Sequence, residues 1–493
     1  MRGGYWSGCL ALLVALAGVV VAPAGAAGVP LPGIQGPIPG DAPGSKDHNY
    51  TFLATDLPLA AAGWVEQEFF MSGQANVYDA TQHVAFGVGS SPDQAPTATV
   101  ASTGHPYKTN LVVRRPLNNA RFNGTVILEW TNVSSRHNNE VGWFMLHDHL
   151  IRNGYAYVVV SAQTVGIVEP VTGLKAWSPV RYGSLDVNDH DSVPRDTLSF
   201  DIFSQAAAAV RTNTGGLLGD LRVKRIIGFG VSQSSGLLGV YVNAIQPLAH
   251  ELDALFLEVG GERIRGDLDI PVVKLNSEAE YINDKTDNEI QTLQPDADGH
   301  GRKGAAGFRT WGVAGTSHTD RISGAVRAGL YARDLDPGAP PDCKAPVSSL
   351  VSIEPVQEAL LEDLNRWITT GKAPPHAPAM NIVSEAPPTE YTDVYGGHNL
   401  ARDSDNNALG GIRLPGLVVP VATNTGSNYG ARGCFLAGSH VSFDAAKLHA
   451  LYPTHEDYVA KFTKAADAVY ARGFILRSGR DALIAEAKSA AVP

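Results

Sequence analysis

Residues 223–245 read VKRIIGF-GVSQS-SGLLGVYVNAI, and this stretch decides the fold. The apolar run over 223–229 predicts a buried β-strand, and 237–245 predicts an α-helix. A sharp turn between them needs small residues, which Gly230 and Ser234 supply on either side of Ser232. We therefore expect the chain to turn directly from strand to helix, with Ser232 at the bend.

Ser232 is a candidate nucleophile in this setting. At the N-terminus of a helix, the partial positive charge favours an anion that develops nearby. The alternative is a serine that only caps the helix, which is common in α/β proteins. The strand before the turn and the helix after it favour the nucleophile, and the chain has no other Gly-x-Ser-x-Gly or Gly-x-Ser-x-Ser sequence.

A serine hydroxyl needs a base, and the stretch FRTWGVAGTSHT at 308–319 offers one. It predicts a strand followed by a small-residue loop that contains His318. An imidazole titrates near pH ~6.5, so it can take the hydroxyl proton and return it. His376, His398 and His440 also follow the turn. Only His318 directly follows an apolar strand, and we predict it as the base.

The acid that orients the base should close the preceding strand, IPVVKLNSEAE at 270–280. Glu278 and Glu280 are both candidates. In Ser277-Glu-Ala-Glu280, the last residue stands where an aspartate often ends a Gly-x-x-Asp turn. We favour Glu280, and Glu278 remains the alternative.

Backbone amides should stabilise the oxyanion of an acyl-transfer intermediate. One donor would be the amide of Gln233, directly after the nucleophile. The other should come from the loop after an early strand, here EWTNVS at 129–134. We expect the amide near Asn132 or Val133, and select Val133.

The rest of the chain alternates strands and helices from Asn110 onward. Expected strands are 125–129, 155–161, 223–229, 252–259, 270–276 and 308–313, and expected helices are 144–153, 198–211 and 237–245. Unbroken apolar runs separated by helices predict parallel strands covered on both faces, which is a mostly parallel, doubly wound α/β sheet. We assign residues 49–493 to one domain, with a helical C-terminus in which 458–473 is the clearest helix.

The N-terminus reads as a secretory signal over residues 1–26. Arg2 precedes the apolar run Leu10–Val21, which is shorter than the ~20 residues of a membrane span, and Ala24-Gly-Ala26 offers a cleavage site. We expect export, to the extracellular space or the periplasm and cell envelope. Residues 27–48 are rich in Gly and Pro and predict a flexible lead-in.

Two features lie later in the chain. Residues 335–411 are rich in proline around a helix at 356–370, and could wrap the sheet or cover a cleft as a lid. Cys343 and Cys434 are the cysteines that remain after the signal segment. An oxidising compartment favours a disulfide between them.

Composition excludes some classes. Hydrophobic residues make up 44 %, which is too many for a disordered chain, and the net charge of −11 disfavours binding to nucleic acid or anionic lipid. Acidic clusters at 186–191 and 403–407 lack the EF-hand pattern for calcium. We expect no metal, no cofactor and no membrane span in the mature chain.

The sequence resembles the secreted alpha/beta hydrolase domain-containing proteins, an esterase-like family. The matching segments span about residues 50–480 and include FNGTVILEWTNVS, GYAYVVVSAQTVGI, SFDIFSQAAAAVR, GFGVSQSSG, VVKLNSEAEYI and FRTWGVAGTSHTD. The resemblance implies an α/β-hydrolase fold with Ser232 as nucleophile and His318 as base. The acid segment of that family usually reads Ser/Thr-Glu-x-Asp, and Glu280 replaces its aspartate here.

These features together predict a secreted serine esterase that acts on a small-molecule or lipid ester through an acyl-enzyme. One alternative is an acyltransferase that uses the same triad with an alcohol acceptor. The other is a secreted, non-catalytic binding protein on this fold. The intact set of serine, acid and histidine favours an enzyme.

Overall fold

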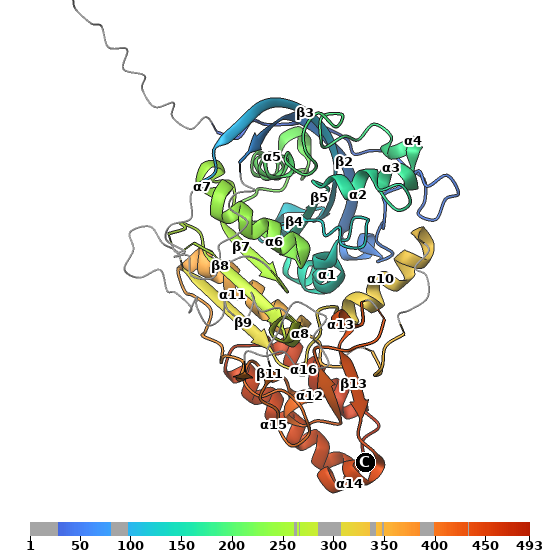
Figure 1. The fold of residues 1–493 in the computed structure, drawn as a ribbon, viewed down its shortest axis with the longest axis vertical. Coiled ribbons are helices and arrows are strands. Elements are labelled where there is room, and N and C mark those ends of the chain that lie inside the picture. Colours follow the sequence, from blue (N-terminus) through green and yellow to red (C-terminus); the bar gives the residue numbers. More distant parts are fainter. Residues whose placement is uncertain are drawn as a thin grey trace, which may run out of the picture.

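One large sheet organises the molecule (Figure 1). The computed structural model describes residues 28–79, 97–260, 264–265, 267–283, 307–335, 342–347, 350–384, 399–431 and 433–493. The nine strands run in the order β1-β2-β3-β5-β4-β6-β7-β8-β9. Their bounds are β1 Gly33–Gln35, β2 Trp64–Tyr78, β3 Val100–Pro116, β4 Thr125–Trp130, β5 Ala156–Val160, β6 Arg225–Val231, β7 Ala254–Glu258, β8 Val272–Ser277 and β9 Phe308–Val313. The expected signal segment 1–26 lies outside the described residues.

The sheet is mostly parallel, as predicted. Strands β4 to β9 pair in parallel, and β1, β2 and β3 form an antiparallel edge. Strand β4 lies between β5 and β6, so the chain adds its next strands first on one side of β4 and then on the other. In a doubly wound sheet, sites form at the carboxyl ends of strands next to such a switch in direction.

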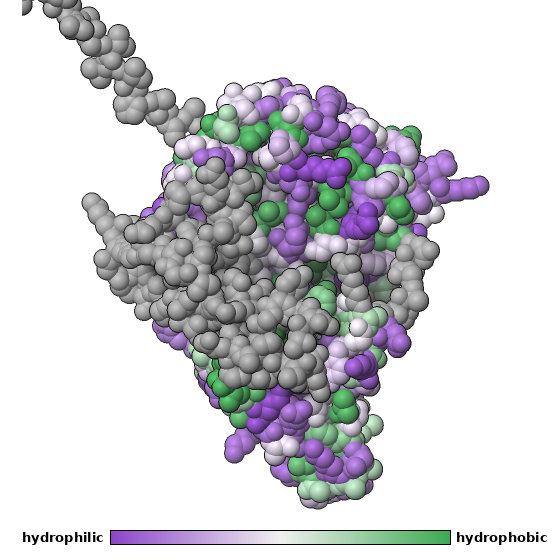
Figure 2. All heavy atoms as spheres, viewed as in Figure 1, coloured by the Kyte–Doolittle hydropathy of each residue, from purple (hydrophilic) through white to green (hydrophobic). Residues whose placement is uncertain are grey.

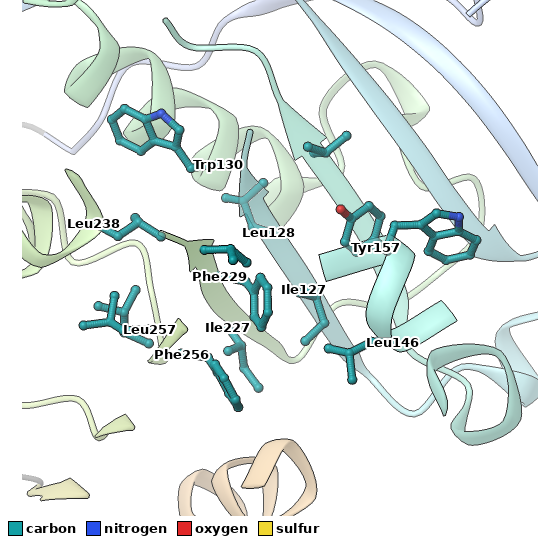
Figure 3. Packing of buried hydrophobic residues seen from close by; sticks show 14 of the residues in the cluster. Ile127, Leu128, Trp130, Leu146, Tyr157, Ile227, Phe229, Leu238, Phe256 and Leu257 are labelled. Carbon is teal, nitrogen blue, oxygen red and sulfur yellow. The ribbon is translucent and has the colours of Figure 1, made fainter. Parts of the chain in front are cut away.

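Helices cover both faces of the sheet. Helices α1 (Val141–Asn153) and α11 (Glu354–Thr370) pack on one face, and α5 (Ser199–Thr212) and α6 (Gln233–Val240) pack on the other. Figure 3 shows Phe229 on the side of α1 and Trp130 on the opposite side. The Trp130 ring lies 5.0 Å from that of Phe203 on α5. Alternate strand residues therefore fill two apolar layers.

Shorter elements complete the described fold. The remaining helices are α2 Thr164–Val168, α3 Leu174–Trp177, α4 Pro179–Tyr182, α7 Gln246–Ala249, α8 Glu278–Asn283, α10 Arg321–Asp334, α12 Pro415–Val418, α13 Cys434–Ala437, α14 Ala445–Leu451, α15 His455–Ala471 and α16 Arg477–Ser489. Two small sheets pair β10 Ile382–Ser384 with β11 Asn399–Leu400, and β12 Ala422–Thr425 with β13 Ser439–Ser442. Within the ranges given above, no helix combines the length and apolar character that crossing a bilayer requires.

The structure differs from the sequence-based expectations at the N-terminal edge. The expectation of a flexible lead-in over 27–48 is wrong for residues 33–35, because they form β1 and pair with β2. The helix after Ser232 begins at Gln233 rather than at Leu237, and continues as a π-helical turn over Tyr241–Ile245. Strands β2 and β3 are not among the predicted strands.

The proline-rich region contributes α11, which packs on the sheet against β7 and β8. Cys343 and Cys434 form the predicted disulfide, with their Cα atoms 5.6 Å apart. Figure 1 shows the elements after residue 412 gathered beyond β9, at the lower end of the view.

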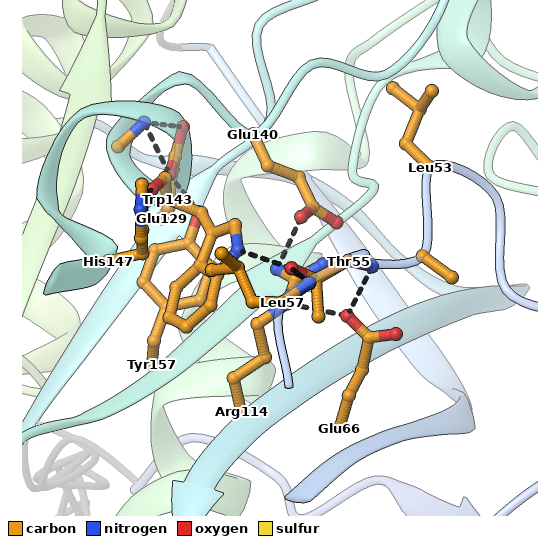
Figure 4. Close-up of polar contacts among 12 residues, drawn as sticks. Leu53, Thr55, Leu57, Glu66, Arg114, Glu129, Glu140, Trp143, His147 and Tyr157 are labelled. Carbon is orange, nitrogen blue, oxygen red and sulfur yellow. Dashed lines mark hydrogen bonds and ion pairs between the residues drawn. The ribbon is translucent and has the colours of Figure 1, made fainter. Parts of the chain in front are cut away.

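A buried polar network lies beneath α1 (Figure 4). The Arg114 guanidinium is fully buried between the carboxylates of Glu66 and Glu140, with its Nε donating to Glu66 at 2.6 Å. Glu129, also fully buried, accepts hydrogen bonds from the Tyr157 hydroxyl and from the amide of Gly142. Burial raises the pKa of Glu129 to about 8, so this carboxyl is mostly protonated at neutral pH.

Candidate active site

Ser232 lies at the bend between β6 and α6. Its backbone has φ 57° and ψ −119°, which is unusual for a residue with a side chain. The amide of Ser232 donates to the carbonyl of Glu258 at 2.9 Å. A Cβ at Gly230 would lie 2.8 Å from Leu238 and 2.9 Å from the carbonyl oxygen of Ser234. The predicted sharp turn is therefore present, and position 230 has no room for a side chain.

His318 reaches Ser232 from the loop after β9. Its Nε2 lies 2.9 Å from the Ser232 hydroxyl oxygen. The loop is fixed on both sides, since the Thr316 hydroxyl donates to Val313 at 2.7 Å and the Thr319 amide donates to Leu436 at 2.8 Å. The bond to Leu436 connects the loop to α13, which begins at the disulfide.

Two of the other histidine candidates, His376 and His440, lie elsewhere in the described structure. His440 instead contacts Asn424 and Ser442 through its two ring nitrogens. His376 is exposed in the segment after α11, and His398 lies outside the described residues.

Glu280 completes the arrangement from the first turn of α8. Its Oε1 lies 2.6 Å from Nδ1 of His318. Its Oε2 accepts from the amide of Ser277 at 2.8 Å and from the Ser277 hydroxyl at 2.6 Å. Because a carboxylate only accepts, Nδ1 carries the proton and Nε2 is left to accept from Ser232.

Glu278 points elsewhere. Its fully buried carboxylate accepts from Arg402 Nη2 at 3.0 Å and from the amide of Gly315 at 2.6 Å. Of the two candidate acids, the structure brings Glu280 to the imidazole. Glu278 instead joins α8, the histidine loop and the segment that carries Arg402.

The loop after β4 lies beside Gln233. The Asn132 side chain donates to the carbonyl of Val231 at 2.9 Å, which fixes this loop against the end of β6. The Val133 amide faces Gln233, but it donates to the side-chain oxygen of that residue at 3.4 Å. The Gln233 side-chain nitrogen in turn donates to Gln163 at 3.1 Å. Nothing in the residue pattern indicated that this side chain would cover the amide.

A further acid, Glu258, was missed by the sequence analysis. It ends β7 next to Ser232, is 3 % exposed, and accepts from the side chain of Gln357 on α11. Burial raises the pKa of Glu258 well above its usual range, and the nearby carboxylates of Asp320, Glu129 and Glu280 raise it further. The place of Glu258 at the end of an apolar strand, ALFLE, was the available signal.

Metal-ligating side chains do not cluster in the part of the chain described here: no three His, Cys, Asp or Glu residues are placed to hold an ion. In the acidic segment 403–407, Asp403 pairs with Arg413, and Asp405 pairs with Lys447 at 2.8 Å. What the geometry offers is a hydroxyl, an imidazole and a carboxylate in a hydrogen-bonded series.

The sequence model of a family described as an alpha/beta hydrolase domain matches residues 34–485. The chain belongs to this family. The resemblance drawn from the sequence motifs is thereby confirmed, and membership supports a hydrolase. The strand order and the helices on both faces agree with an alpha/beta hydrolase domain.

Solved structures resemble this alpha/beta hydrolase only distantly. Esterase Est22 is 12 % identical over 56 % of this chain and 78 % of its own, with a TM-score of 0.31. Siderophore hydrolase EstB from Aspergillus nidulans is 15 % identical over 48 % and 93 %, with a TM-score of 0.27. XC6422 from Xanthomonas campestris, an a/b serine hydrolase without lid, is 14 % identical over 47 % and 92 %, with a TM-score of 0.26. A comparison with curated proteins found no match.

Proposed function

We propose that this alpha/beta hydrolase is an exported serine esterase with Ser232 as nucleophile, His318 as base and Glu280 as the acid that orients it. The observation that carries the proposal is the 2.9 Å contact between the Ser232 hydroxyl and His318, at a bend where Ser232 adopts a positive φ. A capping serine needs neither the strained backbone nor an imidazole at its hydroxyl.

The proposed reaction begins when Nε2 of His318 takes the proton of Ser232 as the hydroxyl oxygen attacks an ester carbonyl. Glu280 stabilises the imidazolium that forms. Collapse of the tetrahedral intermediate releases the alcohol, which receives the proton from His318, and leaves an acyl group on Ser232. A water molecule, deprotonated by His318, then attacks the acyl-enzyme and releases the acid.

The oxyanion would be held by the backbone amides of Gln233 and Val133. The first belongs to the N-terminal turn of α6, where the helix dipole adds positive potential. The second donates to the Gln233 side chain over a long 3.4 Å contact. In this proposal, the substrate oxygen takes the place of that side-chain oxygen, so the Gln233 side chain moves aside when an ester binds.

Export is part of the proposal. The disulfide between Cys343 and Cys434 supports an oxidising compartment, since such bonds are rare where thiols are kept reduced. The apolar stretch within residues 1–26 supplies the expected signal. The substrate class is a carboxylic ester of a small molecule or a lipid.

Hydrolysis of p-nitrophenyl acetate and butyrate tests the enzymatic function. We expect Ser232→Ala to lose the activity, by roughly 10³-fold or more. Ser235→Ala is the matched control, because Ser235 lies on α6 and its hydroxyl has no hydrogen-bond partner among the described residues. Equal turnover by Ser232→Ala and the parent protein would refute the nucleophile.

A further inference from the structure

A cavity lies away from Ser232, between the sheet-covering helices and the C-terminal helices. Its volume is about 430 Å³, which falls within the range of small-molecule sites. Helices α1, α11, α15 and α16 and the start of α10 contribute to its wall. Neither Ser232, His318 nor Glu280 lines it. We call it the seam cavity.

The walls of the seam cavity are largely apolar on the side of the C-terminal helices. Tyr458 and Phe462 on α15 line it, with their ring centroids 5.7 Å apart, and Leu483 and Ala487 on α16 lie beside them. Aromatic faces attract cations as well as apolar groups. This half of the cavity suits a ligand with a hydrocarbon or aromatic body.

The opposite wall carries more negative than positive charge. Both arginines of the wall are already paired: Arg152 donates to Glu358 at 2.8 Å, and Arg321 lies 3.4 Å from Glu486. The wall has two further carboxylates, those of Glu354 and Asp148. Neither forms an ion pair with an arginine or lysine of the described chain.

Glu354 is the more enclosed of these two acids. Its carboxylate makes no hydrogen bond to the described residues, and it lies one turn before Glu358 on α11. Burial and the neighbouring carboxylates of Glu358, Asp320 and Asp148 raise the pKa of Glu354 to about 7. A cation in the cavity would relieve the repulsion among these carboxylates.

We propose that the seam cavity binds a small organic ammonium ion with an apolar body, its cationic head near Glu354 and its body against Tyr458 and Phe462. An anion would meet unpaired carboxylates, because both arginines are engaged. A neutral ligand would leave the excess negative charge uncompensated. The inference does not depend on the proposed esterase activity.

The cavity wall is also connected to the histidine loop. Asp320, two residues after His318, accepts from the amide of Ile353 at 2.8 Å and from the Ser352 hydroxyl at 3.0 Å. Ser352 lines the cavity, and Ile353 precedes Glu354. A ligand in the cavity would therefore lie next to Ser352, whose hydroxyl donates to Asp320 beside the histidine loop.

Isothermal titration with benzyltrimethylammonium chloride at pH 8 tests the proposal. We expect saturable binding to the full chain, unchanged in Ser232→Ala, and no binding of sodium 3-phenylpropionate. Ala482→Trp should abolish binding, because Ala482 lines the cavity from an exposed position. Ala485→Trp should bind normally, since Ala485 is equally exposed on α16 but lies outside the cavity.

The charge is tested separately. Glu354→Gln should weaken binding about tenfold, and Glu456→Gln, an exposed acid outside the cavity, should not change it. Absence of binding to the parent protein, or equal binding by Ala482→Trp, would overturn the proposal. So would equal affinity for the phenylpropionate. Loss of binding in Ser232→Ala would place the ligand at the proposed active site instead, and would also overturn it.

Discussion

Oε1 of Glu280 lies 2.6 Å from Nδ1 of His318, although Glu278, two residues earlier, is the more deeply buried acid. The two carboxylates separate because α8 begins at Glu278. Glu280 turns back to accept from the Ser277 amide and hydroxyl, whereas Glu278 projects toward Arg402 and Gly315. The difference assigns separate roles to two chemically identical side chains.

Replacing each acid in turn should separate these roles. We expect Glu280→Gln to lower kcat by about 10³- to 10⁴-fold with little change in stability, because the amide can hold the imidazole in the wrong tautomer. Glu278→Gln should lower the free energy of unfolding by about 3 kcal/mol, because it removes the charged partner of Arg402. Ester turnover and urea unfolding of both variants check this. A larger kcat loss in Glu278→Gln would contradict it.

The glycine before the nucleophile should be sensitive to a single methyl group. Gly230→Ala would place Cβ within 3 Å of Leu238 and of the Ser234 backbone, so we expect a loss of about 2 kcal/mol or more and reduced turnover. A Cβ at Gly236 on α6 would meet no atom within 4 Å, so Gly236→Ala should be neutral or stabilising by up to about 1 kcal/mol. Thermal unfolding compares them, and similar melting temperatures would count against the tight bend.

The buried network of Glu129 should make stability depend on pH. The pKa of Glu129 is about 8 in the folded protein against 4.5 for the free group, so the folded state holds an extra proton between these values. Its contribution to stability therefore falls as pH rises from 5 to 8, with a slope of up to about 1.4 kcal/mol per pH unit.

Glu129→Gln tests this contribution, because glutamine cannot ionise. Urea unfolding at pH 6, 7 and 8 should show a smaller loss of stability with pH in this variant than in the parent protein. Glu456→Gln, an exposed acid, serves as the control and should follow the parent. An unchanged pH dependence in Glu129→Gln would show that the carboxyl is ionised in the folded state.

The disulfide should matter to the site as well as to stability. Cys434 begins α13, and Leu436 in the same helix accepts the amide of Thr319, next to His318. We expect dithiothreitol to lower the free energy of unfolding by about 2–4 kcal/mol and to lower ester turnover in parallel. The Cys343→Ser/Cys434→Ser protein should already show both losses and should not respond to reductant. Unchanged turnover after verified reduction would separate the bond from the histidine loop.

The sequence predicted the parts of this molecule that depend on local pattern. The apolar runs at β4 to β9 are fully or nearly fully buried, and Ser232 and His318 follow two of them directly. Strands β2 and β3 were missed because charged residues interrupt their apolar pattern. Two of these, Glu68 and Arg114, are buried only because distant partners satisfy them: Arg181 for the first, and Glu66 with Glu140 for the second.

The direction in which a side chain points was the second feature that could not be predicted from the sequence. Spacing could not decide between Glu278 and Glu280, because the choice depends on where α8 begins and on the hydroxyl of Ser277. It also could not show that the Gln233 side chain lies against the Val133 amide. Both outcomes depend on contacts between segments that are far apart in the chain.

The most direct test of the central claim is to locate the adduct of a fluorophosphonate probe by peptide mass spectrometry. The account predicts one modified residue, Ser232, in the folded protein. Labelling should be lost after denaturation and strongly reduced in His318→Ala, because the hydroxyl then lacks its base. An adduct on another serine, or undiminished labelling of Ser232 in His318→Ala, would contradict the account.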